Sequence, residues 1–241
     1  MTQNIPFLTV VDAILNENQP FPAKLLHRFS NLEPVDLKKL KSAWPQVSQH
    51  RKHTLLEDLE DLADADHLSS FSELARSLMG DPDPQVRTRA IRLLGESDDL
   101  ELVPVFLTLL CKEEDVEVRA ASANALGQFV YLGELDKIPS ERYQKMVDQL
   151  LSSTKLPNPI LIRRRALESL GFSGHPDVVS LIEKAFNEKD PDWRVSALVA
   201  MGRSCDARWR KPVLSQLRSP DEDIRTKAIH AAGELELEGA R

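Results

Sequence analysis

The stretch DPDPQVRTRAIRLLGE, residues 81–96, decides the fold because its pattern recurs along the chain. Aligned on the last glycine, VRTRAIRLLG (86–95) has four later counterparts: VRAASANALG (118–127), IRRRALESLG (162–171), WRVSALVAMG (193–202) and IRTKAIHAAG (224–233). The arginine in second position recurs at intervals of 31 or 32 residues, except for one interval of 44. A nearly constant period of this length indicates a repeat protein in which every unit is one supersecondary structure.

Each repeat is predicted to be a hairpin of two helices. In the recurring segment, apolar residues such as Val86, Ala90 and Leu94 stand at helical spacing and form one apolar face. Another amphipathic segment precedes it, for example LELVPVFLTLLCKEE (100–114). A hairpin cannot cover its own apolar face, so successive hairpins are expected to stack. Five glycines are expected to end the second helices in a left-handed conformation: Gly95, Gly127, Gly171, Gly202 and Gly233.

The recurring segment resembles the HEAT-repeat family, particularly the short bacterial form also seen in phycobilin lyases, over about residues 70–241. The resemblance implies an all-α fold, a right-handed α-α superhelix (HEAT/armadillo-like solenoid) of about five helical hairpins. In that family, an aspartate in the hairpin turn and an arginine early in the second helix link stacked repeats. This implies a structural ladder of Asp81, Arg87, Arg119, Arg163, Arg194 and Arg225. Anion binding by the same arginines is the alternative.

Residues 1–69 lie outside the period and are predicted to form an N-terminal helical cap or degenerate repeat. FPAKLLHRF, VDLKKLKSAW and HRKHTLLEDLEDLAD indicate three helices there, with Trp44 packed on the cap. Residues 70–241 are predicted to be the HEAT-like repeat solenoid, with Trp193 in its core. An insertion near 128–161 is expected to extend one helix and lengthen two loops, and it is a candidate contact site. The helix from residue 224 has no following unit, so either a longer natural chain or a contact through this C-terminal helix is expected.

Composition bears on the compartment and on the class of partner. The formal net charge is −7, so the molecule as a whole repels polyanions. No lysine or arginine precedes Lys24, and no apolar run approaches the roughly 18 residues of a membrane span. Cys111 and Cys205 are interpreted as structural thiols in a reducing environment. The sequence therefore predicts a cytoplasmic protein without a membrane segment.

No catalytic constellation is found. The segment GFSGH (171–175) lacks the last glycine of the G-x-S-x-G motif, and there is no phosphate loop or dinucleotide fingerprint. His50, His53 and Glu57 share a helical face, which Asp61 extends, but this face is opposite the apolar one and is interpreted as solvated. No catalytic, cofactor-binding or metal-binding residue is predicted, and the chain is predicted not to be an enzyme.

The charge is unevenly distributed along the chain. Residues 57–117 carry 17 acidic and 5 basic side chains, whereas residues 191–230 carry 8 basic and 5 acidic ones. Such polarity can orient a partner. The predicted function is a non-catalytic protein- or peptide-binding scaffold that uses the concave face of the solenoid for an acidic or mixed-charge segment. A tetrapyrrole (bilin) lyase or chaperone-like protein is the alternative, and DNA binding is disfavoured because the chain lacks an overall positive charge.

The candidate surface follows from helical geometry. Counted from the first apolar residue of each second helix, positions +3, +6 and +10 face away from the buried stripe. The partner-binding strip selected in this way consists of Arg89, Arg92, Asn124, Arg165, Glu168, Val199, Arg203, Lys227 and His230.

Overall fold

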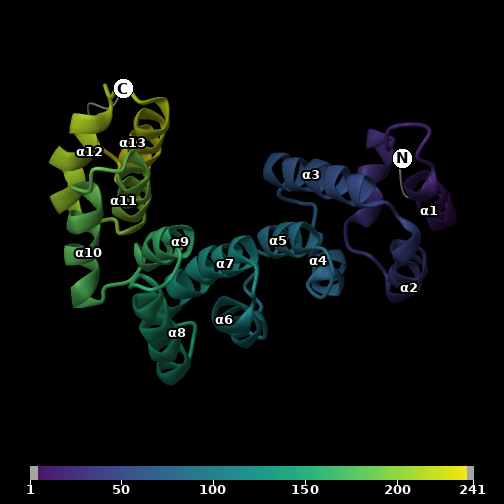
Figure 1. Cartoon of the computed structure of the whole chain (residues 1–241), viewed down its shortest axis with the longest axis horizontal. Coiled ribbons are helices and arrows are strands. Elements are labelled where there is room, and N and C mark those ends of the chain that lie inside the picture. The colour runs from purple at the N-terminus through teal and green to yellow at the C-terminus, as the bar shows by residue number, and fades with distance from the viewer. Residues whose placement is uncertain (1–4, 238–241) are drawn as a thin grey trace. The chain divides into compact units, whose positions relative to one another are not determined.

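The computed structural model describes residues 5–237, and in that range it contains helices and loops but no strand (Figure 1). The predicted all-α fold is confirmed. The chain divides into two compact units, residues 1–97 and 98–241. We call them the N-terminal and C-terminal units. The division at residues 69 and 70 expected from the sequence stays a prediction.

In residues 5–69 the N-terminal unit contains one helix more than the three expected, when the 3-10 turn at residues 44–46 is counted with the helix that it directly continues. Its elements are α1 (Phe7–Leu15), the 3-10 helix η2 (Ala23–Phe29), α2 (Pro34–Ala43), the 3-10 helix η3 (Trp44–Gln46), α3 (Gln49–Ala65), α4 (Ser72–Leu78) and α5 (Pro84–Leu93). Helix α1 is the unexpected one, and the Phe7 ring meets the Phe29 ring edge-on at 6.2 Å. Trp44 is buried, as expected.

The C-terminal unit is a series of helical hairpins (Figure 1). Its elements are α6 (Leu102–Lys112), α7 (Val116–Glu134), α8 (Ser140–Ser153), α9 (Ile160–Leu170), α10 (Pro176–Phe186), α11 (Pro191–Arg203), the 3-10 helix η4 (Ala207–Trp209), α12 (Arg210–Gln216) and α13 (Glu222–Glu234). The second helices of the hairpins, α7, α9, α11 and α13, pack on one another in chain order. Each first helix packs on the second helix that follows it. This is the stacking expected of a solenoid.

An aspartate at the N-cap starts most of the second helices. The side chains of Asp83, Asp115, Asp190 and Asp221 each accept a hydrogen bond from a backbone N–H in the first turn of their helix. These bonds satisfy N–H groups that have no partner inside the helix. The recurring acidic turn is thus explained by capping.

The expectation that glycines end the second helices in a left-handed conformation is wrong. Gly127 and Gly202 lie inside helices, and Gly171 has a right-handed φ of −52°. Gly127, Gly171 and Gly202 instead allow neighbouring second helices to approach closely. A Cβ atom on Gly171 would lie 2.6 Å from the Ala200 Cα atom of α11, which is a steric clash.

The insertion lengthens helices more than loops. Helix α7 has 19 residues, the first helix α8 has 14, and short loops flank α8. The expected extension of one helix is therefore present. Trp193 differs from the expectation, because it is half-buried while Val86 and Ile224, at the same repeat position, are buried.

Other expectations concern the thiols, the last helix and membrane spans. Cys111 and Cys205 are free thiols, but both are exposed and therefore not core residues. On α13, Ile224 and Ala228 are buried while Ile229 is 56% exposed, so a contact through this helix stays a prediction. No helix within residues 5–237 is long and apolar enough to cross a membrane.

Candidate binding face

The arginine at the second position of each recurring segment holds its hairpin together. We call these five residues the arginine column: Arg87, Arg119, Arg163, Arg194 and Arg225. Each of the five arginines stands four residues after the N-cap of its helix and donates to a carbonyl near the end of the preceding helix. Arg119 Nε lies 2.9 Å from the Leu110 oxygen, and Arg163 Nε lies 3.1 Å from the Thr154 oxygen. Arg87, Arg194 and Arg225 make the equivalent bonds to Asp81, Phe186 and Ser219. These charge-assisted bonds satisfy carbonyls that the helix or the turn leaves unpaired.

Two members of the column also reach the next hairpin. Arg119 Nη2 donates to the side-chain oxygen of Asn158 at 3.0 Å, across to the turn before α9. The Arg163 guanidinium lies 5.1 Å from the centre of the Trp193 ring on α11. These contacts fit the implied ladder role, which stays a prediction until stability is measured.

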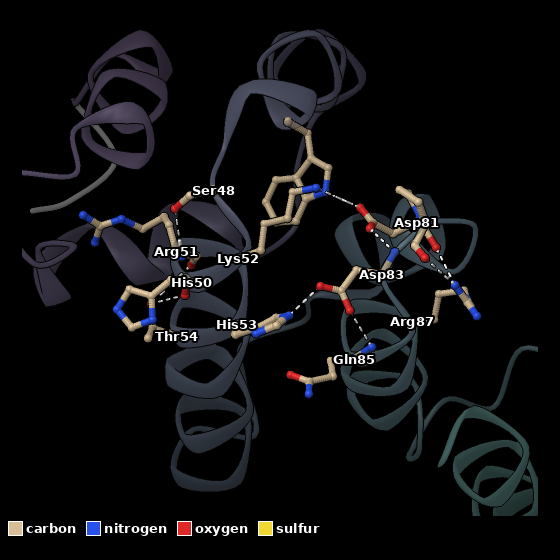
Figure 2. Close-up of polar contacts among 12 residues, drawn as sticks. Ser48, His50, Arg51, Lys52, His53, Thr54, Asp81, Asp83, Gln85 and Arg87 are labelled. Atoms are coloured by element: carbon tan, nitrogen blue, oxygen red, sulfur yellow. Dashed lines mark hydrogen bonds and ion pairs between the residues drawn. The ribbon is translucent and has the colours of Figure 1, made fainter. Parts of the chain in front are cut away.

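Asp81 connects the first repeat to the helices before it (Figure 2). Its carboxylate accepts hydrogen bonds from Trp44 Nε1 at 2.7 Å and from Lys52 Nζ at 3.3 Å. Lys52 stands four residues after the N-cap Ser48 of α3, which is the position of the arginine in the repeats. Helix α3 therefore occupies the place of a second helix in a preceding repeat. The repeat pattern in the sequence does not reveal this relationship, because a lysine stands in place of the arginine.

The expected solvated face of α3 is partly wrong. His53 is half-buried, and its Nε2 atom lies 2.6 Å from the Asp83 carboxylate (Figure 2). His50 and Glu57 are exposed. Burial raises the pKa of Asp83, but the hydrogen bond to His53 and the backbone bond from Gln85 outweigh it and leave the pKa lowered. Within the described part of the chain, no group of three or more His, Cys, Asp or Glu side chains could hold a metal ion.

Two strip residues belong to the N-terminal unit. Arg89 forms ion pairs with Glu60 at 2.6 Å and with Glu57 at 3.5 Å, both on α3. Burial raises the pKa of Glu60, although the positive charge of Arg89 acts against it. Arg92 is exposed. The Arg89 guanidinium is thus engaged in ion pairs within the unit, whereas the Arg92 side chain is accessible to a partner.

In the C-terminal unit, Glu168 corrects the expected strip. It is 2% exposed, because α11 covers it, and so it does not face solvent. Its carboxylate accepts hydrogen bonds from Arg165 Nη1 at 2.7 and 2.9 Å and from the Ser196 hydroxyl at 2.6 Å. Arg164 donates to the same Ser196 oxygen and pairs with Asp192. Glu168 therefore links α9 to α11 as a buried polar partner.

Among the remaining strip residues, Arg203 belongs to a row of aromatic and cationic side chains. The Tyr131 and Phe172 rings are 5.5 Å apart, and the Arg203 guanidinium lies 5.0 Å from the Phe172 ring centre. Arg203 Nη1 also donates to the backbone oxygen of Glu168 at 3.0 Å. Burial lowers the pKa of Arg203. Tyr131 is 44% exposed, so one end of the row is open to solvent.

Tyr131 and Phe172 are absent from the strip expected from the sequence. Phe172 stands at position +10 of its segment, which is the position of Arg203 in the next repeat, so the same rule could have found it. Tyr131 lies on the extra length of α7, where the period gives no guidance. We define the second-helix face as the following residues of the C-terminal unit: Asn124, Tyr131, Arg165, Phe172, Val199, Arg203, Lys227 and His230.

Comparison with known proteins agrees with this architecture. Residues 71–140 match the sequence model of HEAT repeats. The phycocyanin operon protein Z of Pseudanabaena tenuis (strain PCC 7409), described as uncharacterized, is 25% identical over 163 residues, which cover 67% of this chain and 78% of that protein.

Two solved structures are similar to this chain over most of its length. An engineered protein has a TM-score of 0.46 at 17% identity and covers 88% of this chain and 96% of its own. Human deoxyhypusine hydroxylase in complex with glycerol has a TM-score of 0.40 at 16% identity and covers 96% of each chain.

Proposed function

We propose that this protein is a non-catalytic scaffold that binds a partner protein or peptide through the second-helix face. The row of Tyr131, Phe172 and Arg203 is the observation that carries this proposal. The few residues that carry most of the binding energy at protein interfaces are enriched in aromatic and arginine side chains. Arg203 packs on Phe172 and donates a hydrogen bond to the Glu168 backbone carbonyl. These contacts fix the row before a partner binds, which lowers the entropic cost of binding.

The charges around the row favour an acidic or mixed-charge segment. Lys227 and His230 on α13 are at least partly exposed, and Arg165 on α9 keeps 39% of its side chain accessible beside its ion pair with Glu168. Exposed Glu234 on α13 adds a negative group near Arg203. The partner segment is expected to place an apolar side chain against Tyr131 and carboxylates against the cations.

A bilin lyase or chaperone-like role is the second candidate, and one arrangement favours it. A flat ligand with carboxylate groups needs an aromatic surface beside a cation, and Tyr131, Phe172 and Arg203 offer both. The relative from the phycocyanin operon supports considering this ligand class. DNA is the least favoured partner because the net charge of the chain is −7.

Affinity capture from the host, followed by quantitative mass spectrometry, tests the proposal. The variant Tyr131→Ala/Lys227→Glu alters the second-helix face, and Leu68→Ala/Lys24→Glu is its control on the N-terminal unit, where Leu68 is 91% exposed. We expect the first variant to lose partners that the control keeps. Equal capture by both variants would contradict the proposed face. An absorbance change on mixing with biliverdin, lost in Phe172→Ala, would favour the second candidate.

The proposal includes a cytoplasmic location. The free thiols of Cys111 and Cys205 are exposed, and such thiols persist in a reducing compartment.

A further inference from the structure

A groove follows α10 along its whole length in the C-terminal unit. One part, of about 610 Å³, lies between the start of α10, the α9–α10 loop and η4. A second part, of about 280 Å³, continues towards Pro212 of α12 and shares Glu183, Arg208 and Trp209 with the first. We call the two parts together the α10 groove. Its volume is in the range of sites that bind ligands or side chains of a partner.

The floor of the α10 groove is apolar. Val178 and Ile182 stand one helical turn apart on α10, and both are almost completely buried. The Trp209 ring of η4, also buried, lies opposite them, and Phe186 extends the apolar lining at the other end. These buried side chains form the base of the groove, and the half-buried Val179 and Phe186 provide the apolar surface that a partner can contact.

The rim of the α10 groove carries a fixed carboxylate. Glu134 Oε1 accepts hydrogen bonds from the Tyr143 hydroxyl and from the Gly174 backbone N–H, the latter at 2.8 Å. Tyr143 is itself held by the Ser173 hydroxyl at 2.8 Å. Burial and the bond to Glu134 raise the pKa of Tyr143 to about 12, so the phenol stays the donor at neutral pH. Among the described residues, the other oxygen of Glu134 accepts no hydrogen bond.

The net charge of the rim is negative. Glu183 is exposed at the point where the two parts of the groove meet. Arg208 is the cation of the lining, and its charge is balanced by Asp206, whose carboxylate lies 2.6 Å from Arg208 Nε. The charges of Glu134 and Glu183 thus remain uncompensated by the other lining side chains.

We propose that the α10 groove docks a basic amphipathic segment of a partner protein. Apolar side chains of the segment lie on the half-buried Val179 and Phe186. Lysine or arginine side chains extend their aliphatic stems along the groove and place their cationic groups at Glu134 and Glu183. The α10 groove shares Phe172 with the second-helix face, but its uncompensated charge is negative, whereas the cations lie on that face.

Two synthetic peptides with the same leucine pattern test the proposal, one with lysine and one with glutamate at the polar positions. Binding to the full chain is followed by amide chemical shifts. We expect only the lysine peptide to shift the Gly174 and Val179 signals saturably. Glu134→Gln/Glu183→Gln is expected to weaken this binding about fivefold, because two partly exposed ion pairs are lost. The control Glu117→Gln/Glu141→Gln makes the same change of net charge at exposed positions outside the groove.

Three outcomes would overturn the proposal. The first is that the control variant weakens binding as much as the groove variant, which would indicate general attraction to an acidic protein. The second is that the glutamate peptide binds as well as the lysine peptide. The third is that the lysine peptide still binds to Val179→Lys, which adds bulk and positive charge to the groove, while the melting temperature shows that this variant is folded. Lys227→Ala, on the second-helix face and outside the groove lining, is expected to leave the binding intact, which separates this test from that of the second-helix face.

Discussion

Lys52 and Asp81 form a buried ion pair, with 3.3 Å between the ammonium nitrogen and the carboxylate, that joins α3 to the turn before α5 (Figure 2). The Lys52 ammonium also lies 5.1 Å from the centre of the Trp44 ring. Lys52 stands at the repeat position of the arginines, so the connection between hairpins begins before the first segment that the sequence identifies as a repeat. We expect this pair to stabilise the N-terminal unit.

Lys52→Met should lower the free energy of unfolding by about 3 kcal/mol, because it leaves the Asp81 charge buried without a cation. The double variant Lys52→Met/Asp81→Asn should recover part of this loss, since the asparagine side chain is neutral and can still accept from Trp44. Urea unfolding of the parent, the two single variants and the double variant measures the coupling. Additive losses would show that the two residues act independently.

Arg119 is expected to be structural. Arg119→Ala removes donors to Leu110 and Asn158 and should cost about 1 to 3 kcal/mol of unfolding free energy. Arg119→Lys should recover only part, because an ammonium group cannot reproduce the planar fork of donors. Arg218→Ala, away from the column on the partly exposed turn after α12, is the control and should stay within about 0.5 kcal/mol of the parent. Loss of partner binding with unchanged thermal unfolding would instead make this column a binding site.

Gly171 tests the close approach of α9 and α11. Gly171→Ala places a Cβ atom 2.6 Å from the Ala200 Cα atom and should destabilise the chain by about 1 to 3 kcal/mol. Gly233→Ala is the matched control, because nothing lies within 4 Å of its Cβ position and alanine favours a helix. We expect Gly171→Ala to lower the melting temperature and Gly233→Ala to raise it. A stabilising Gly171→Ala would show that the two helices can separate without cost.

Tyr143 should make the protein sensitive to alkali. Its pKa is raised to about 12 from an ordinary value of 10.0, so the folded state holds the proton more tightly than the unfolded state. This contribution to stability is complete below pH 10 and is lost as the pH rises towards 12. Tyr143→Phe should flatten the dependence of the melting temperature in that window. An unchanged slope would mean that other groups, such as lysines, cause the alkaline loss.

The sequence predicted the parts of the fold that depend on period. The spacing of apolar residues and of the arginine marked the second helices, because each repeat must bury the same stripe and bond the same carbonyl. The first helix, α1, was not predicted, although its buried residues Phe7, Val10, Val11 and Ile14 stand at helical spacing. The role of the glycines was misjudged because sequence shows a small residue near a helix end but not which neighbouring helix packs against it.

The candidate face could be predicted only in part. Position on one helix indicated that Arg203 and Glu168 point away from the core of their own hairpin. Whether the next hairpin covers such a position depends on packing between repeats, and α11 covers Glu168. Tyr131 lies on the lengthened α7, so no register in the sequence assigns it to the face.

Site-specific photo-crosslinking in the host cell tests the central claim most directly. A benzoylphenylalanine replaces Tyr131 on the second-helix face in one protein, and exposed Gln144 on α8 in the other. The account predicts one defined protein adduct from position 131 that is absent from position 144 and is lost when Arg203→Ala is added. No adduct at position 131, or the same adducts from both positions, would contradict it.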